Sequence, residues 1–170
     1  EEKLDVKSIL QQSAIDFEGG YALAGMIGHG DAFVLRDPAG IRPCFWYADD
    51  EVVVAASERP AIQTAFGLKI GQVQELQPGH ALIVKKDGTY TTEEILQPLE
   101  KRACSFERIY FSRGSDQDIY RERIALGRSV CPAILEAIDH DMENTVFSFI
   151  PNTAEVACYG MMKEMEDELD

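Results

Sequence analysis

The stretch FVLRDPAGIRPCFW, residues 33–46, joins two apolar runs through a loop rich in glycine and proline, and the predicted fold is built around it. Asp37 stands before a proline, a combination that starts turns, and Gly40 supplies a backbone position that can take a positive φ. Arg36 and Arg42 flank the aspartate and can hold the loop through charge-assisted hydrogen bonds. The residues alone favour a structural turn, and an active-site loop remains the alternative.

Apolar segments on both sides of this loop predict an antiparallel sheet. A short polar connection joins YALAGMIG to AFVLRD, and two aspartates separate CFWYA from EVVVAAS, as in β-hairpins. Pro-Gly and Asp-Gly turns bracket HALIVKK, and TYTTEEIL follows. Residues 21–96 are therefore predicted to be mainly sheet. One helix is predicted before it, over residues 4–17, and a second within it over ERPAIQTAF, capped by Ser57 and ended by Gly67.

The pattern changes after about residue 106. RIYFS predicts a short buried strand, residues 119–139 repeat apolar groups at helical spacing, and TVFSFI predicts another strand. A final helix is expected from about Ala154. Pro132 lies inside the helical run and is expected to end or kink it. This order of strand, helix, strand and helix is typical of the start of a parallel α/β unit.

Composition excludes several classes of protein. Acidic residues outnumber basic ones 30 to 16, for a net charge of −14, which argues against binding to nucleic acid. No window approaches the run of about 18 apolar residues that a membrane span needs. The four cysteines form no C-x-x-C pair, a usage that fits the reducing cytoplasm and neither a disulfide framework nor a zinc site.

Several motifs follow one another in the order and spacing of a known enzyme family. They are GGYALAGMIGHGDAFVLRDPAGIRPCFW, AASE, LQPGHALIV and CSFERIYFSRGSD. On these motifs the chain resembles the amidophosphoribosyltransferases from about residue 17 to about residue 160. The resemblance implies an α+β fold in two parts. Residues 1–106 would be the later half of an Ntn-hydrolase αββα sandwich, the glutamine amidotransferase domain. Residues 107–170 would be a linker strand and the beginning of an α/β type I phosphoribosyltransferase domain.

The resemblance also implies what the parent protein does. Members of the family transfer ammonia derived from glutamine to phosphoribosyl pyrophosphate, giving phosphoribosylamine, glutamate and pyrophosphate in the first committed step of de novo purine biosynthesis. A Mg²⁺-dependent, cytoplasmic homo-oligomer is implied. The family's glutaminase nucleophile is a cysteine at the mature amino terminus. This sequence starts at Glu1, so we expect a piece of a longer protein with no catalytic residue, no activity and no bound cofactor of its own.

Two segments near the carboxyl end resemble parts of the family's second site. FSFIPNTAEVACYG resembles its first strand and pyrophosphate loop, which implies substrate binding by Asn152 and Thr153 and a Mg²⁺ contact for Thr153. Physically, either residue can equally cap the following helix. Tyr110 matches a family tyrosine near the path of ammonia, and its alternative is a core aromatic on a buried strand.

Other interpretations stay open. The spacing of Cys104 and the other cysteines argues against an iron–sulfur cluster, which needs about four thiolates. The parent can be another class II amidotransferase joined to a different synthase. A degenerate paralogue retained as a regulatory or scaffolding subunit is a third possibility, kept open by departures from the family at Gly114 and Ala154. Half a sandwich exposes sheet edges, so self-association is predicted.

Overall fold

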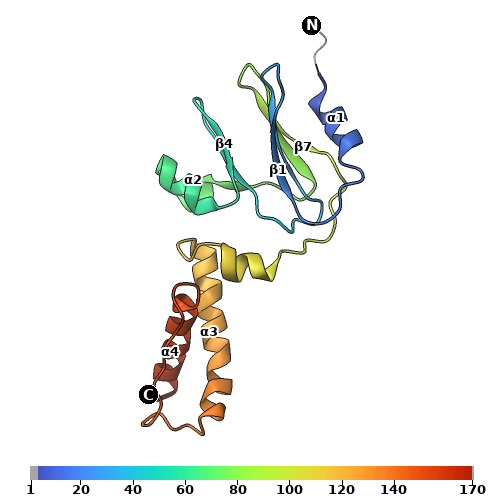
Figure 1. Ribbon diagram of the computed structural model, residues 1–170. Coiled ribbons are helices and arrows are strands. Elements are labelled where there is room, and N and C mark those ends of the chain that lie inside the picture. Colours follow the sequence, from blue (N-terminus) through green and yellow to red (C-terminus); the bar gives the residue numbers. More distant parts are fainter. Residues whose placement is uncertain (1–3, 170) are drawn as a thin grey trace. The chain divides into compact units, whose positions relative to one another are not determined.

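A computed structural model describes residues 4–169 and divides the chain into two compact units at the Cys104–Ser105 peptide bond (Figure 1). The sequence placed the domain boundary after residue 106. The assignment of the two units to the two predicted domains stays a prediction.

The first unit contains two antiparallel sheets. The strands of the larger sheet lie in the order β1-β2-β6-β7, with bounds Ala22–Met26, Ala32–Arg36, His80–Val84 and Tyr90–Glu94. The strands of the smaller sheet lie in the order β4-β3-β5, with bounds Val53–Ala56, Phe45–Ala48 and Gln74–Glu75. The predicted hairpins β1–β2, β3–β4 and β6–β7 are all present in register, which confirms the turns that joined them.

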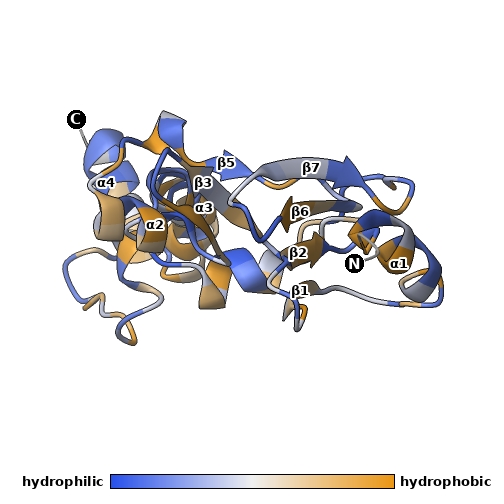
Figure 2. Cartoon of the chain, turned by 90° about the horizontal axis from the view of Figure 1, so that it is seen from above, coloured by the Kyte–Doolittle hydropathy of each residue, from blue (hydrophilic) through white to orange (hydrophobic). Residues whose placement is uncertain are grey.

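Successive side chains of a strand point to opposite faces of its sheet, and in this unit each sheet has the other sheet on one face and a helix on the opposite face. Leu35 of β2 packs with α1 (Val6–Ser13), whereas the preceding Val34 faces the smaller sheet. In β3, Trp46 faces the larger sheet, while the ring of Tyr47 contacts Phe66 of α2 (Arg59–Phe66). Within this unit the layers are therefore helix, sheet, sheet and helix. The central strands β2 and β6 carry the hydrophobic residues and the edge strand β7 is more hydrophilic (Figure 2).

The predicted start of α2 was wrong by one residue. Glu58, and not Ser57, takes the N-cap position, in extended backbone and without a side-chain cap bond. A proline in the first turn favours this start because its missing N–H would have no partner there. Gly67 ends the helix in the left-handed conformation, at φ 64°, as predicted. A short 3₁₀ turn, η1 (Ile70–Gln72), leads into β5.

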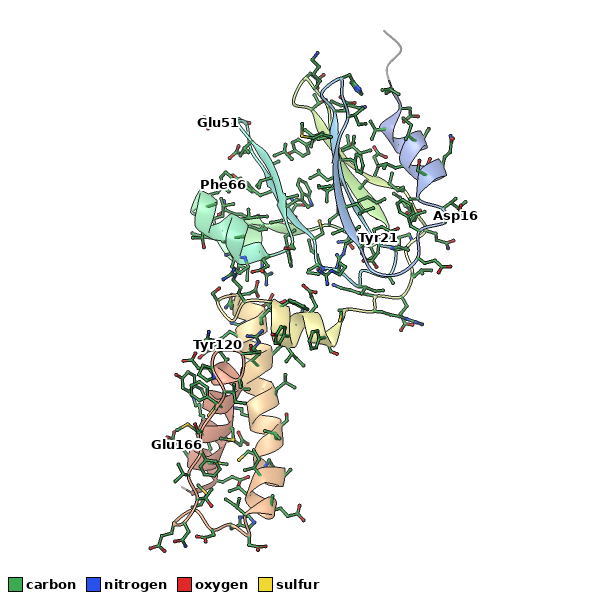
Figure 3. All side chains as sticks on the ribbon, in the orientation of Figure 1. Asp16, Tyr21, Glu51, Phe66, Tyr120 and Glu166 are labelled. Atoms are coloured by element: carbon green, nitrogen blue, oxygen red, sulfur yellow. The ribbon has the colours of Figure 1, made fainter. Side chains whose placement is uncertain are left out.

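The second unit is a pair of helices with a turn before them. These are η2 (Glu107–Phe111), α3 (Gln117–Ala137) and α4 (Glu155–Leu169). The helices run parallel, since the early Ile124 of α3 contacts Gly160 and the later Arg128 pairs with Glu164. Tyr120 near the start of α3 and Glu166 near the end of α4 accordingly lie at opposite ends of the pair (Figure 3).

Two further predictions for this unit were wrong. RIYFS is a π-helical turn, closed by a bond from the Ser112 N–H to the Glu107 carbonyl oxygen (2.7 Å). TVFSFI, residues 145–150, has no strand assignment. A strand needs a hydrogen-bonded neighbour, and residues 105–169 contain none. Of the two effects predicted for Pro132, the end of the helix is not found, because α3 continues to Ala137 while packing along α4.

Candidate functional site

Arg36 makes most of the side-chain contacts that hold the loop between β2 and β3. Its side chain is only 2% exposed at the end of β2. Nε donates to the Arg42 carbonyl oxygen (2.8 Å), and Nη2 donates to that of Gly40 (3.2 Å). Nη1 pairs with Glu75 Oε1 (2.9 Å) and donates to the carbonyl oxygen of Leu76. The guanidinium therefore joins the loop to the end of β5 and to the residue that follows that strand.

Asp37 holds the same loop from inside. Its fully buried carboxylate accepts hydrogen bonds from the backbone N–H groups of Ile41 (2.8 Å) and Arg42 (3.0 Å). Gly40 has φ 60°, and a Cβ there would lie 2.9 Å from Pro78 Cγ, so a side chain would be strained and crowded. The structure thus brings the four loop residues together, with the side chains of Arg36 and Asp37 turned toward backbone groups.

Tyr110 lies on the π-helical turn of the second unit and not on a buried strand. Its side chain is 59% exposed. The ring stacks on Phe106, with centroids 5.1 Å apart and planes 13° apart, and meets Phe111 edge to face at 5.2 Å. These three exposed rings form an aromatic surface.

Asn152 and Thr153 lie in the turn that precedes α4. Asn152 is exposed and Thr153 half-buried, and the Asn152 carbonyl oxygen accepts from the Glu155 N–H (3.3 Å). Within residues 4–169 neither side chain bonds a backbone N–H of the first turn of α4, so the capping alternative finds no support. A hydroxyl and an amide therefore remain next to the positive end of a fifteen-residue helix.

The metal-binding potential is limited. Among residues 4–169 no group of three or more histidine, cysteine, aspartate or glutamate side chains is placed to hold a metal ion. Cys44 is buried in the first unit, Cys131 and Cys158 are buried in the second, and Cys104 is half-buried.

No helix within the described residues is both long and apolar enough to cross a membrane.

An apolar groove of about 460 Å³ lies between the two sheets of the first unit. It runs over β1 and β2 beside the edge strand β4, and its lining residues are all apolar or glycine. Such a lining provides neither acid, base nor nucleophile, so the groove has no chemistry of its own.

Four buried charged residues were not predicted from the sequence: Asp31, Glu107, Asp116 and Arg123. Asp31 accepts from Lys85 Nζ and from the Lys86 N–H (both 2.9 Å), and the Lys85 bond lowers the pKa of the carboxyl to about 2. Arg123 is 6% exposed in α3. A signal for Arg123 existed in the sequence: it occupies the helical stripe at intervals of four residues that Ile119, Gly127 and other buried positions share.

No family model matches the chain. The amidophosphoribosyltransferase of Pasteurella multocida is 32% identical over 133 residues, which are 73% of this chain and 26% of that enzyme. The enzyme of that name from Archaeoglobus fulgidus is 28% identical over 169 residues, 96% of this chain and 34% of its own length. The chain is homologous to the amidophosphoribosyltransferases.

Solved structures agree with this amidophosphoribosyltransferase homology. The glutamine phosphoribosylpyrophosphate amidotransferase of B. subtilis, complexed with ADP and GMP, matches 98% of this chain with a TM-score of 0.71, at 23% identity and over 35% of its own chain. A structure described as the allosteric regulatory enzyme of purine biosynthesis matches 96% with a TM-score of 0.70, at 25% identity and over 34% of its chain. The predicted resemblance to this family is confirmed as homology, and the mixed helix-and-sheet fold is confirmed. The chain spans about a quarter to a third of the length of these relatives.

Proposed function

We propose that the full-length protein containing this chain is an amidophosphoribosyltransferase. It transfers ammonia from glutamine to phosphoribosyl pyrophosphate and so forms phosphoribosylamine, glutamate and pyrophosphate, the entry to purine biosynthesis. The observation that carries the proposal is the 32% identity to an enzyme of that name over 73% of the chain. The degenerate scaffolding paralogue and the other class II amidotransferase are not favoured by these relatives.

The two units take different parts in this proposal. The helix, sheet, sheet and helix layers of the first unit support the later half of an Ntn glutaminase domain. Its nucleophile would be an amino-terminal cysteine, and the three buried cysteines at positions 44, 131 and 158 are unsuited to attack a substrate. We therefore expect the polypeptide of these 170 residues to hydrolyse no glutamine by itself.

The second unit supplies one edge of the phosphoribosyltransferase site. We assign Asn152 and Thr153 to the pyrophosphate loop, because their side chains lie at the amino-terminal end of α4, where an anion is stabilised. The hydroxyl of Thr153 suits Mg²⁺, which takes few protein ligands and binds mainly through substrate phosphates and water. Bound there, the ion would neutralise charge on the leaving pyrophosphate.

Tyr110 is assigned to the path of ammonia between the two sites. An exposed ring stacked on Phe106 presents an apolar face, which excludes water from a neutral molecule passing along it. In the same proposal the enzyme is cytoplasmic and takes glutamine and phosphoribosyl pyrophosphate as substrates. The edge strand β1, with Met26 87% exposed, favours a homo-oligomer.

Steady-state assays of the full-length protein test the function. Pyrophosphate release is measured with phosphoribosyl pyrophosphate, Mg²⁺ and either glutamine or ammonia, and both nitrogen sources are expected to support it. Thr153→Ala removes one hydrogen bond to a charged group and is expected to lower the rate by roughly ten- to a hundredfold. Thr92→Ala, on the exposed strand β7, is the control. A wild-type protein that releases no pyrophosphate with either source contradicts the proposal.

A further inference from the structure

Arg123 is a buried cation that the proposed function leaves unused. It lies on the face of α3 that packs inward, between Ile119 and Gly127, and its side chain is only 6% exposed. Burial lowers the pKa of its guanidinium. A charged group on such a helix face is costly unless its donors are satisfied, so its partners indicate what it does.

The partners are backbone carbonyl oxygens of a single turn. Nη2 of Arg123 donates to those of Arg108 (3.0 Å), Ile109 (2.8 Å) and Ser112 (2.6 Å). Its Nε is buried with no hydrogen-bond partner, and no carboxylate within residues 4–169 forms an ion pair with it. The positive charge is therefore stabilised by the carbonyl dipoles at the end of η2.

The three carbonyl oxygens bracket Tyr110. Ile109 precedes it directly and Ser112 follows two residues later, so one guanidinium nitrogen fixes the backbone on both sides of the tyrosine. A Cβ on the neighbouring Gly114 would make ordinary van der Waals contacts, 3.5 Å from Arg123 Nη1 and 3.4 Å from Val156 Cγ2 of α4, so the segment after the turn passes close to both helices. The turn is thus held against the helix pair at one point.

We propose that Arg123 is a positioning residue that holds the π-helical turn against α3 and thereby sets where the Tyr110 ring lies. The assignment rests on the proposed path of ammonia past Tyr110. If the turn relaxes, the Phe106–Tyr110–Phe111 surface loses its fixed arrangement, and ammonia released from glutamine escapes before it reaches the second site. Ammonia supplied from solution does not need that path.

The ratio of glutamine-dependent to ammonia-dependent synthesis in the full-length protein is the decisive readout. With Arg123→Met we expect this ratio to fall by about ten- to a hundredfold, the size of effect that a displacement of about 1 Å can have. Arg123→Lys keeps a cation with three donors and is expected to restore most of it. Arg128→Met is the matched control, since it removes an arginine of the same helix that pairs with Glu164 (3.0 Å) and not with the turn.

Hydrogen exchange gives a second, activity-free readout. We expect faster exchange of the amides of residues 108–112 in Arg123→Met and unchanged exchange there in Arg128→Met. Unchanged exchange in both variants overturns the proposal, and so does an equal loss of both activities that leaves the ratio constant. A wild-type protein with neither activity would refute the proposed function instead, and the exchange experiment would still decide whether Arg123 holds the turn.

Discussion

Asp31 shows how a single carboxylate joins two strands of the larger sheet. It follows the turn between β1 and β2 and accepts hydrogen bonds from Lys85 and Lys86, which follow β6, with His29 Nε2 3.1 Å away. Its side chain is almost fully buried. These contacts favour the ionised form, so the pKa of Asp31 falls from 3.8 to about 2 in the folded protein.

A pH-dependent stability difference follows for Asp31→Asn. The ionised carboxylate stabilises the fold above its unfolded pKa of 3.8, and this contribution is lost as the pH falls through the folded pKa of about 2. Asp31→Asn is therefore expected to have a lower Tm than wild type at pH 7, and the difference is expected to shrink between about pH 4 and pH 2. Thermal melts over this range, with the exposed Asp16→Asn as control, check it. A Tm difference that does not change with pH would count against the assigned role.

The buried loop around Asp37 is expected to be structural. Asp37→Ala leaves the partly buried N–H groups of Ile41 and Arg42 without their acceptor, which costs about 1–3 kcal/mol. The control Asp16→Ala, at an exposed position, is expected to stay within about 0.5 kcal/mol of wild type. Urea unfolding measures both variants. An Asp37→Ala protein as stable as its control would show that the loop does not depend on this carboxylate.

At the scale of the helices, α3 and α4 meet through glycine. A Cβ on Gly127 would lie 1.8 Å from the Ala157 carbonyl oxygen, and one on Gly160 would lie 2.2 Å from that of Ile124. The backbones therefore touch at two places along the parallel pair. No side chain fits there without separating the helices.

Replacing either glycine with alanine tests this contact. Helix propensity alone would stabilise the protein by about 1 kcal/mol, because alanine is the better helix former. The overlap with a carbonyl oxygen opposes this and is expected to win, with a net loss of about 1–3 kcal/mol for Gly127→Ala. Gly28→Ala, where nothing lies within 4 Å of the added Cβ, is the control for unfolding in urea. A stabilised Gly127→Ala variant would contradict the close packing of α3 and α4.

Residues 145–150 alternate in burial like a strand although they pair with none. Phe147 and Phe149 pack on the α3–α4 core, while Val146 is 92% and Ile150 84% exposed. The exposed side chains of Val146 and Ile150 form an apolar row, which we expect the rest of the full-length protein to cover.

Val146→Lys tests whether Val146, exposed in the 170-residue chain, is covered in the full-length protein. In the 170-residue chain the exposed side chain is expected to be replaceable within about 0.5 kcal/mol, whereas Phe147→Ala costs about 1–2 kcal/mol of packing. In the full-length protein Val146→Lys would bury a charge and is expected to cost more than about 2 kcal/mol. Denaturant unfolding of both lengths provides the comparison. Equal tolerance of Val146→Lys in the two would show that Val146 stays exposed in the full-length protein.

A strand could be predicted from the sequence where the strand that pairs with it lies close by in the chain. The hairpins were predictable because a short polar connection and the two apolar runs that it joins lie within a few residues of one another. RIYFS and TVFSFI are similarly apolar. A strand also needs a hydrogen-bonded neighbouring strand, which can be distant in the sequence and which no local pattern predicts. At the site, family motifs pointed to Tyr110 and Thr153. The role of Arg123 depended on three carbonyl groups eleven to fifteen residues away and was missed.

At the scale of the whole molecule, the homology to amidophosphoribosyltransferases covers most of this chain but only a quarter to a third of its relatives. We propose that the first unit, with its helix, sheet, sheet and helix layers, is half of a glutaminase domain, and that the second unit contributes Thr153 to the transferase site and Tyr110 to the ammonia path. The proposed glutamine-dependent reaction uses both the glutaminase and the transferase domain, because ammonia made at one site is consumed at the other.

Transfer of labelled nitrogen tests this claim most directly. Full-length protein is supplied with phosphoribosyl pyrophosphate, Mg²⁺ and glutamine carrying ¹⁵N in its amide, in the presence of unlabelled ammonium. If ammonia passes from glutamine to the second site as proposed, the phosphoribosylamine formed carries the ¹⁵N label. Unlabelled product, or glutamate release with no phosphoribosylamine, would contradict this proposal.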